Sequence, residues 1–116
     1  MARVLLFGLE STVAEELSSA LRQVGECVLT AAHDWGVFEQ GDFELVFATA
    51  IDLTNVQEIC PGVPVVVVSR LPEVSAWLEA LERGAADYCG APFEARQVRW
   101  VLNSTLTQAH RRAAAA

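Results

Sequence analysis

Five short runs of continuous apolar residues recur along the chain, and they limit its fold more than any other feature. The runs cover residues 4–7, 27–32, 45–48, 65–68 and 88–89. Apolar runs without alternation are typical of strands that are buried on both faces. The runs therefore predict a parallel sheet with helices on both of its sides.

Segments with helical periodicity separate these runs. In the first segment, Thr12 followed by Glu15 fits a capping box, and Gly25 fits a helix end. The apolar stripe between them consists of Val13, Leu17, Leu21 and Val24. This stripe predicts a helix that packs on one face of the sheet.

Two more helices are expected nearer the C-terminus. Pro72 suits the first turn of one helix, and Gly84 suits its end. The apolar packing of that helix is expected from Trp77, Leu78 and Leu81. The last helix is predicted over residues 94–109, and the residues expected to face the sheet are Val98, Val101, Leu102 and Leu106.

Alternating strands and helices predict one doubly wound α/β domain over residues 1–109, which suits a chain of 116 residues. Residues 110–116 are expected to form a C-terminal tail or the start of a linker. The connections at residues 33–42 and 50–62 leave room only for shortened helices. A ligand site in such a domain is expected at the carboxyl ends of the strands.

The charge balance and the cysteines exclude several classes of function. The net charge of −7 argues against direct binding of nucleic acid. The chain contains no lysine, which excludes Schiff-base and P-loop lysine chemistry. Cys27, Cys60 and Cys89 have no C-x-x-C spacing and are expected to be reduced thiols. Because the apolar runs are too short to cross a membrane, a cytoplasmic protein is expected.

Residues 63–93 read VPVVVVSRLPEVSAWLEALERGAADYCGAPF. This stretch resembles the last third of a response regulator receiver domain. In that family a buried strand, a helix ending at Gly-Ala and a strand with an aromatic residue precede a Lys-Pro-Phe sequence. The resemblance extends over nearly the whole chain. It implies a CheY-like, flavodoxin-like sheet of five parallel strands in the order 2-1-3-4-5, in a protein of bacterial two-component signalling.

The resemblance also implies which residues occupy the phosphorylation pocket. In receiver domains an acidic pair after the first strand holds Mg²⁺, an aspartate after the third strand accepts phosphate, and a hydroxyl residue and a lysine stabilise the product. The matching positions in this chain are Gly8, Leu9, Thr49, Ser69 and Ala91. Only Ser69 keeps the family's type of side chain. The side chains of Gly8 and Leu9 cannot bind a metal, and Thr49 is a poor phosphate acceptor without a base. Ala91 cannot contact a phosphoryl group as a lysine does.

The chain is therefore interpreted as a degenerate pseudo-receiver that is not an enzyme and uses no Mg²⁺ or cofactor. A shift of one residue would bring in Glu10 but not the remaining groups. Asp52, three residues beyond Thr49, is a candidate substitute acceptor, and its alternative is a solvated loop residue.

The family's switch aromatic corresponds to Tyr88, and a surface for protein contacts is expected around it, on the family's helix four, strand five and helix five. The expected interaction face consists of Trp77, Tyr88, Arg96, Arg99 and Trp100. Aromatic residues and arginines are typical anchors of interfaces. The alternative is that both tryptophans pack in the core and that the charges are a solvated surface.

Two functions follow from this interpretation. The first is a phosphorylation-independent module for protein interaction or dimerisation, at the N-terminus of a larger regulator such as a transcription factor. The second is a small-molecule sensor whose emptied pocket, around Gly8, Thr49, Ser69 and Ala91, holds an apolar or neutral ligand. Trp35 and Phe38 are expected near the rim of that pocket.

Overall fold

Five parallel strands form a single sheet in the computed structural model, which describes residues 2–25, 27–71 and 73–115, with side chains up to residue 107. The strands are β1 (Ala2–Phe7), β2 (Cys27–Ala32), β3 (Leu45–Ala48), β4 (Val65–Ser69) and β5 (Asp87–Gly90). The helices are α1 (Ser11–Val24), the 3-10 helix η1 (Trp35–Gln40), α2 (Leu53–Ile59), α3 (Val74–Glu82) and α4 (Ala95–Ala115). The order β2-β1-β3-β4-β5 confirms the predicted fold.

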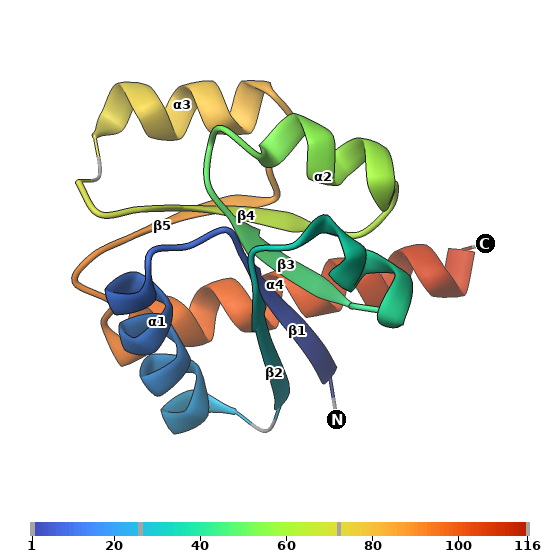
Figure 1. The fold of residues 1–116 in the computed structure, drawn as a ribbon, viewed down its shortest axis with the longest axis horizontal. Helices are drawn as coiled ribbons and strands as arrows, with labels where there is room; N and C mark the ends of the chain where they lie inside the picture. The colour runs from blue at the N-terminus through green and yellow to red at the C-terminus, as the bar shows by residue number, and fades with distance from the viewer. Residues whose placement is uncertain (1, 26, 72, 116) are drawn as a thin grey trace.

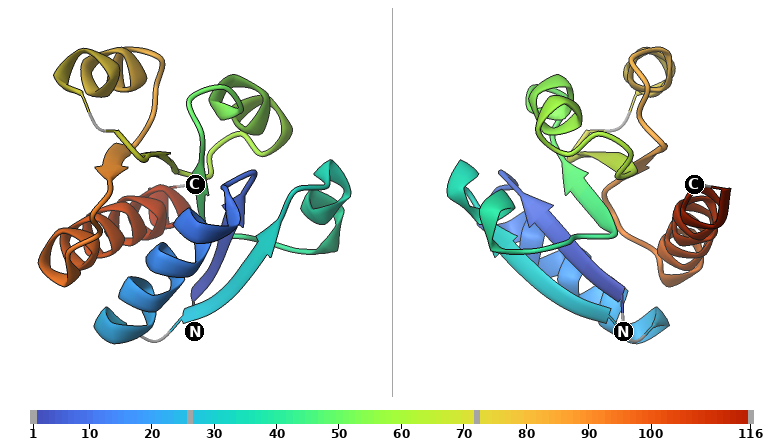
Figure 2. Two further views of the ribbon diagram at one scale, coloured as in Figure 1. Left: turned by 60° about the vertical axis from the view of Figure 1, so that its left-hand side comes forward. Right: turned by 90° about the vertical axis from the view of Figure 1, so that its right-hand side faces the viewer.

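Helices cover both faces of the sheet, as the uninterrupted apolar strands predict. Helices α1 and α4 lie on one face, and η1, α2 and α3 lie on the other (Figures 1 and 2). Successive residues of β1 alternate between two buried clusters: Val4 and Leu6 pack with α1 and α4, whereas Leu5 and Phe7 pack with the opposite layer. The side chains of β1 are therefore buried on both sides of the sheet.

The start of α1 differs from the predicted capping box. The helix begins at Ser11, and Ala14 donates its backbone N–H to the carbonyl of Glu10. Thr12 therefore lies inside the first turn, where it cannot act as the cap. The apolar stripe is confirmed, because Val13, Leu17 and Leu21 are buried, and the helix ends at Gly25 as predicted.

The packing of α3 also differs from the prediction. Trp77, Leu78 and Leu81 are exposed, and the buried residue of this helix is Ala80. A small residue therefore faces the sheet, and the large apolar side chains of α3 point to solvent. Pro72, predicted at the start of this helix, lies outside the described residues.

The lengths of the helices follow the predictions except at the C-terminal end of α4. The two short connections hold η1 and the seven-residue α2, as expected. Helix α4 continues to Ala115, beyond the predicted end at residue 109. Gln, Arg and Ala favour the helical conformation, which explains why the helix does not end earlier. Val98, Val101 and Leu102 are buried, and Leu106 packs against the same cluster.

The three cysteines form no disulfide, as predicted from their spacing. Cys89 on β5 is fully buried, and Cys27 and Cys60 are partly buried. Burial, together with the nearby negative charge of Asp87, raises the pKa of the Cys89 thiol to about 12. Separately, none of the described helices is long and apolar enough to cross a membrane.

Candidate functional site

The loops after β1, β3 and β4 meet at one edge of the sheet. The register places Phe7 beside Ala48 and Ala48 beside Val67, so these three strands end side by side. A cavity of about 410 Å³ lies between the loops. Gly8, Leu9, Thr49 and Ser69 all line it, as the sequence analysis expects of the former phosphorylation pocket. Ala91 adjoins it through a backbone hydrogen bond to the Ser69 carbonyl (3.0 Å), after which the Ala91–Pro92 peptide is cis.

Gly8 occupies a position that excludes a side chain. Its φ of +69° lies in the left-handed region, which glycine tolerates best. A β-carbon at this position would also lie 2.6 Å from Oδ2 of Asp52. The Asp52 carboxylate therefore lies beside the position where receiver domains carry an acidic residue. Sequence reasoning placed Asp52 near the pocket, and the structure adds that it is packed against Gly8.

Local hydrogen bonds occupy the two hydroxyl groups of the pocket. The backbone N–H of Asp52 donates to the Thr49 hydroxyl oxygen (3.3 Å) and to the Thr49 carbonyl (3.2 Å). The backbone N–H of Leu71 donates to the Ser69 hydroxyl oxygen (3.2 Å). Both hydroxyls therefore stabilise the turns that follow their own strands, and neither is paired with a base among the described residues that would activate it as a nucleophile.

An ion pair spans the mouth of the cavity. Nη1 of Arg70 donates to Oε2 of Glu10 at 2.8 Å and to Oε1 at 3.2 Å. Glu10 follows β1 and Arg70 follows β4, so the pair links the loops on either side of β3. The side chains are 61% and 66% exposed, respectively, and such an exposed pair opens at little cost in free energy.

The carboxylates around the pocket do not assemble into a metal centre. Within the described ranges, no group of three or more His, Cys, Asp or Glu residues could hold a metal ion. Glu10 is paired with Arg70, and Asp52 is the other carboxylate at this edge. Mg²⁺ prefers several oxygen ligands in octahedral geometry, which these two side chains do not supply.

A second hollow lies between α3, β5 and α4. This groove has a volume of about 400 Å³, and three residues of the predicted interaction face line it: Trp77, Tyr88 and Trp100. Trp100 is 71% exposed and Trp77 is 43% exposed, so the alternative that both tryptophans pack in the core is wrong. Glu73, Val74 and Gln97 also contribute to the groove.

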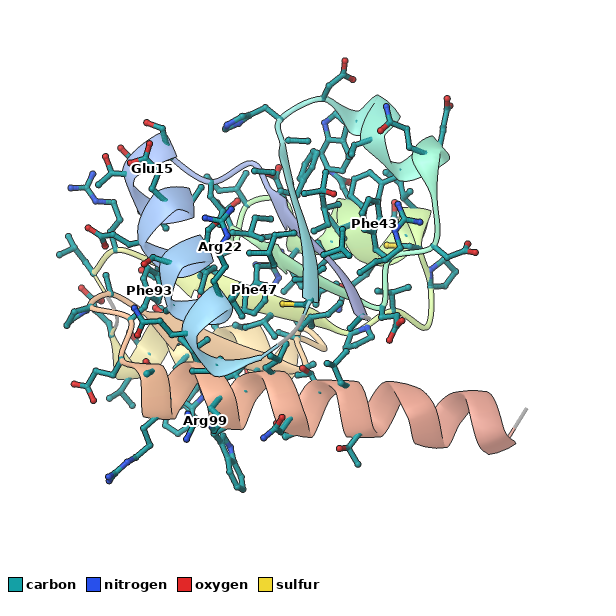
Figure 3. All side chains as sticks on the ribbon, turned by 90° about the horizontal axis from the view of Figure 1, so that it is seen from below. Glu15, Arg22, Phe43, Phe47, Phe93 and Arg99 are labelled. Atoms are coloured by element: carbon teal, nitrogen blue, oxygen red, sulfur yellow. The ribbon has the colours of Figure 1, made fainter. Side chains whose placement is uncertain are left out.

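The two arginines of the predicted face lie on the outer side of α4. Arg96 and Arg99 are exposed, and Figure 3 shows Arg99 projecting away from α1 and from Phe47 in the core. Trp100 follows Arg99 directly and lines the groove. The structure therefore groups the five predicted residues into an aromatic groove and an adjacent basic strip on α4.

Trp35 and Phe38 lie away from the pocket that they were expected to close. Both rings pack on Phe7, with centroid distances of 4.5 Å and 5.0 Å, respectively. The cavity at the strand ends is lined by other residues. The pair belongs to the η1 layer because η1 positions both side chains over the end of β1.

Two arginines have structural roles that were not predicted from the sequence. Arg70 pairs with Glu10 at the cavity mouth, and Arg83 at the end of α3 donates to the Ala50 carbonyl (3.0 Å) and the Thr54 hydroxyl (2.9 Å). The position of Arg70 directly after Ser69 could have suggested a role at the strand ends. No local pattern indicates the reach of Arg83, because its partners are about thirty residues away in sequence.

Several solved structures share this arrangement, and some of them are receiver domains. NtrX from Brucella abortus in complex with ADP superposes with a TM-score of 0.86 at 22% identity, covering 99% of this chain and 28% of that chain. A response regulator receiver domain protein from Clostridium thermocellum gives 0.77 at 18% identity, covering 93% and 96%. The signal receiver domain of an HD domain-containing protein from Pseudomonas fluorescens gives 0.81 at 16% identity, covering 97% and 91%.

The chain thus has the fold of the receiver domains of bacterial two-component response regulators. It spans less than a third of NtrX. No protein-family model and no curated protein matches the chain by sequence.

Proposed function

We propose that this domain is a phosphorylation-independent pseudo-receiver that binds another protein chain through the groove between α3, β5 and α4. It acts in the cytoplasm as a regulatory domain of bacterial signal transduction. The observation that carries the proposal is the contrast between the two hollows of the domain. At the strand ends, the Thr49 and Ser69 hydroxyls and the Glu10 carboxylate are engaged in hydrogen bonds within the domain, whereas the groove displays exposed aromatic residues.

The pocket contacts support loss of phosphoryl chemistry. Gly8 cannot supply a metal ligand, and its φ and the Asp52 carboxylate oppose a side chain there. The Thr49 hydroxyl accepts a hydrogen bond from Asp52, and the Glu10 carboxylate is paired with Arg70. The described residues near Asp52 include no group of three or more His, Cys, Asp or Glu side chains to hold a cation that would offset the charge of a phosphoryl group.

The outer face of α3 supports a role in protein contacts. Val74, Trp77, Leu78 and Leu81 are all exposed, and Trp100 lies across the groove from α3. A helix with apolar residues on both its inner and outer sides is typical of a helix that is covered on both sides. Exposed apolar patches of this kind mark interaction surfaces in monomeric domains.

Charge on this face favours a second copy of the chain as the partner. Helix α3 carries exposed Glu79 and Glu82, and α4 carries exposed Arg96 and Arg99. In a two-fold symmetric dimer the same surface contacts itself, and an axis that passes between α3 and α4 places α3 of one copy against α4 of the other. The acidic and basic residues would then pair across the interface on both sides of the axis.

Sedimentation across a range of protein concentrations tests self-association. Arg99→Glu should weaken the association constant by about tenfold, because like charges then face each other at both halves of the interface. Arg22→Glu on α1 is the matched control, since it reverses an exposed charge outside the face. Equal effects of the two substitutions would contradict the proposed face.

A charge swap between two variant chains sharpens this test. One chain carries Arg96→Glu with Arg99→Glu, and the other carries Glu79→Arg with Glu82→Arg. Each variant alone should be monomeric, and an equimolar mixture should form a heterodimer, because both of its half-interfaces are complementary. A mixture that stays monomeric would exclude this pairing of α3 with α4.

Loss of phosphoryl chemistry is tested separately by amide NMR with Mg²⁺ and beryllium fluoride, a mimic of an acyl phosphate. No saturable shift is expected at Thr49, Asp52, Ser69 or Tyr88. A saturable shift of these amides would show that the pocket still binds a phosphoryl group. This result would contradict phosphorylation independence without bearing on self-association.

The kind of protein that the domain regulates stays a prediction from the resemblance to receiver domains. We propose that the domain regulates a larger protein such as a transcription factor. The receiver domain from Pseudomonas fluorescens belongs to an HD domain-containing protein, so a connection to a domain of that kind is the alternative. Helix α4 continues past the domain core to Ala115, which suits a helical connection to a further domain.

A second candidate function is small-molecule sensing. The observation that favours it is the cavity of about 410 Å³ at the strand ends, whose volume falls in the range of ligand pockets. Leu9, Val13, Val67, Val68 and Ala76 give it an apolar wall.

A further inference from the structure

Strand β2 lies at an edge of the sheet and pairs with β1 on its inner side (Figure 2). The backbone N–H of Gly8 donates to the Ala32 carbonyl (2.9 Å), so the backbone groups of Ala32 point toward β1. Because backbone groups alternate in direction along a strand, those of Leu29 and Ala31 point away from the sheet. Within the described residues, no loop or side chain forms a hydrogen bond to them. The outer edge of β2 therefore presents unpaired donors and acceptors.

Strand β2 contains none of the features that protect an edge from pairing. Its six residues, CVLTAA, include no charge and no proline, and Val and Thr favour extended backbone. Natural sheets commonly protect an edge with charges, prolines or a very short strand. The opposite edge, β5, is four residues long and carries Asp87, whose carboxylate accepts the Tyr88 backbone N–H (2.7 Å). Of the two edges, β2 is therefore the one suited to pairing with another strand.

The side chains leave this edge open on the face that carries η1. Ala32 packs with the cluster beneath η1, and side chains alternate along a strand, so Val28 and Thr30 lie on the same face. Val28 is 46% exposed, because η1 packs on Phe7 at the end of β1 and not over the start of β2. A strand paired with β2 would cover Val28 and remove its apolar surface from water.

Helix α1 leaves room beside β2 on the other face. Glu16, Gln23 and Phe93 help to line a hollow between α1 and the segment before α4, which identifies the flank of α1 that faces α4. Ala14 and Ser18 are four residues apart and lie together on the opposite flank, toward the edge of the sheet. Both side chains are small, so a second domain can approach beside β2.

Strand β2 is complementary to a second copy of itself. Two antiparallel strands related by a two-fold axis bring the same faces together only when the axis passes through a residue, since side chains alternate. With the axis at Thr30, Leu29 and Ala31 of the two copies form hydrogen-bonded pairs, because both point outward. Val28 then lies opposite Ala32. Thr30 lies opposite Thr30, which is a favourable cross-strand pair.

Charges at the two ends of β2 also favour a second copy. Arg3 lies beside Val28 at the start of β2, with its guanidinium 5.1 Å from the centre of the Phe43 ring. Asp34 follows the end of β2 and caps η1. Antiparallel pairing places the start of one β2 beside the end of the other, so Arg3 of each copy lies on the side of Asp34 of the second copy. Opposite charges then attract at both ends of the strand pair.

We propose that β2 is a second association surface, at which two copies of the chain join edge to edge through antiparallel β2 strands with a two-fold axis at Thr30. This contact goes beyond the proposed function and does not use the groove between α3, β5 and α4. One six-residue strand buries little surface, so the edge contact forms at a higher protein concentration than the groove contact. Because β2 and β5 are at opposite edges, a chain that uses both contacts assembles into an open row of copies.

Disulfide trapping tests the register in a chain that carries Cys27→Ser and Cys60→Ser. Thr30→Cys should form a covalent dimer under mild oxidation, because its two Cα atoms lie about 4.5 Å apart in this register. Val28→Cys is the matched control on the same face, with its two Cα atoms about 13 Å apart and out of disulfide range. Covalent dimer at equal rates in the two variants, or in neither, would overturn the proposed contact.

A mixture of two variant chains tests the same register at a second pair. Val28→Cys mixed with Ala32→Cys should give a covalent heterodimer, because the two positions lie opposite each other. Neither chain should give a covalent dimer alone, since each position lies about 13 Å from its own copy. Absence of the heterodimer would overturn the axis at Thr30.

Sedimentation separates the edge contact from the groove. In the chain with Arg96→Glu and Arg99→Glu, residual association is measured at up to about 1 mM protein. Ala31→Pro in this background removes an outward N–H where an edge strand tolerates proline, and it should weaken residual association by about tenfold. Ala31→Ser keeps the N–H and should leave this association unchanged. Equal association of the two variants would overturn the edge contact.

The edge contact and the groove contact can fail independently. Trapping at Thr30 in a chain without groove association would uphold the edge contact and overturn the groove dimer. Groove association without trapping at Thr30 would uphold the groove dimer and overturn the edge contact. If the amide spectrum shows that Ala31→Pro does not fold, the trapping experiments alone decide.

Discussion

Oδ2 of Asp52 lies 2.6 Å from the point that a β-carbon on Gly8 would occupy. The backbone of Gly8 has a φ of +69°, which residues other than glycine rarely adopt. Position 8 is therefore shaped for glycine by its own backbone and by its neighbour. An acidic side chain introduced at position 8 should therefore not fit the pocket as it stands.

Gly8→Asp should lower the free energy of unfolding by about 1–3 kcal/mol, through left-handed strain and repulsion by Asp52. Urea unfolding followed by tryptophan fluorescence measures this change. Gly8→Ala separates the strain from the added charge. Asp52→Ala in the Gly8→Asp background should recover part of the loss, and a Gly8→Asp protein as stable as the wild type would contradict the proposed constraint.

Arg83 should stabilise the turn between β3 and α2, because it donates to the Ala50 carbonyl and to the Thr54 hydroxyl. Arg83→Ala should lower the free energy of unfolding by about 1 kcal/mol and speed hydrogen exchange at residues 50–54. Arg83→Lys should have an intermediate effect. Arg22→Ala on α1 is the control, and unchanged exchange in Arg83→Ala would show that the two bonds do not restrain the turn.

The sheet was predictable because its strands are buried on both faces. Continuous apolar runs such as residues 65–68 produce a signal that does not depend on distant contacts. The helix beginning at Ser11 was found by its stripe, but its first residue was misplaced by a capping pattern at Thr12 that the backbone does not use. Local sequence patterns thus predicted which segments form helices and strands more reliably than the residues at which these begin and end.

The site was predictable only in part. The resemblance located Gly8, Thr49 and Ser69 at the strand ends, and the structure brings them into one cavity. Side-chain pairing was not predictable, since Glu10 and Arg70 are sixty residues apart. The exposure of Trp77 and Trp100 was likewise not predictable, because an apolar residue on a helix fits the same sequence pattern whether its side chain faces the core or a partner.

The ion pair between Glu10 and Arg70 should be weak, because both side chains are largely exposed. A double-mutant cycle with Glu10→Gln and Arg70→Gln should give a coupling energy below about 1 kcal/mol. The coupling should shrink further as salt is added. A coupling energy above about 2 kcal/mol that resists salt would mean that the pair holds the cavity mouth shut.

The stability of the domain should depend on pH through Cys89. Its folded pKa is about 12, against about 9 for an unperturbed thiol, because burial and the Asp87 charge disfavour the thiolate. Between these values the unfolded chain releases a proton that the folded chain retains. The stabilising contribution is therefore complete below about pH 9 and is lost as the pH rises toward 12.

Urea unfolding under reducing conditions at pH 8 and pH 10.5 measures this loss. The free energy of unfolding should fall by up to about 1.4 kcal/mol per pH unit above pH 9 from this thiol alone. Cys89→Ala should reduce that slope, although the cavity it creates lowers stability at both pH values. Cys27→Ala is the control, because burial raises the pKa of this partly buried thiol as well, and its slope should fall less than that of Cys89→Ala. Equal slopes in the wild type and in Cys89→Ala would mean that the β5 thiol ionises in the folded domain as readily as in the unfolded chain.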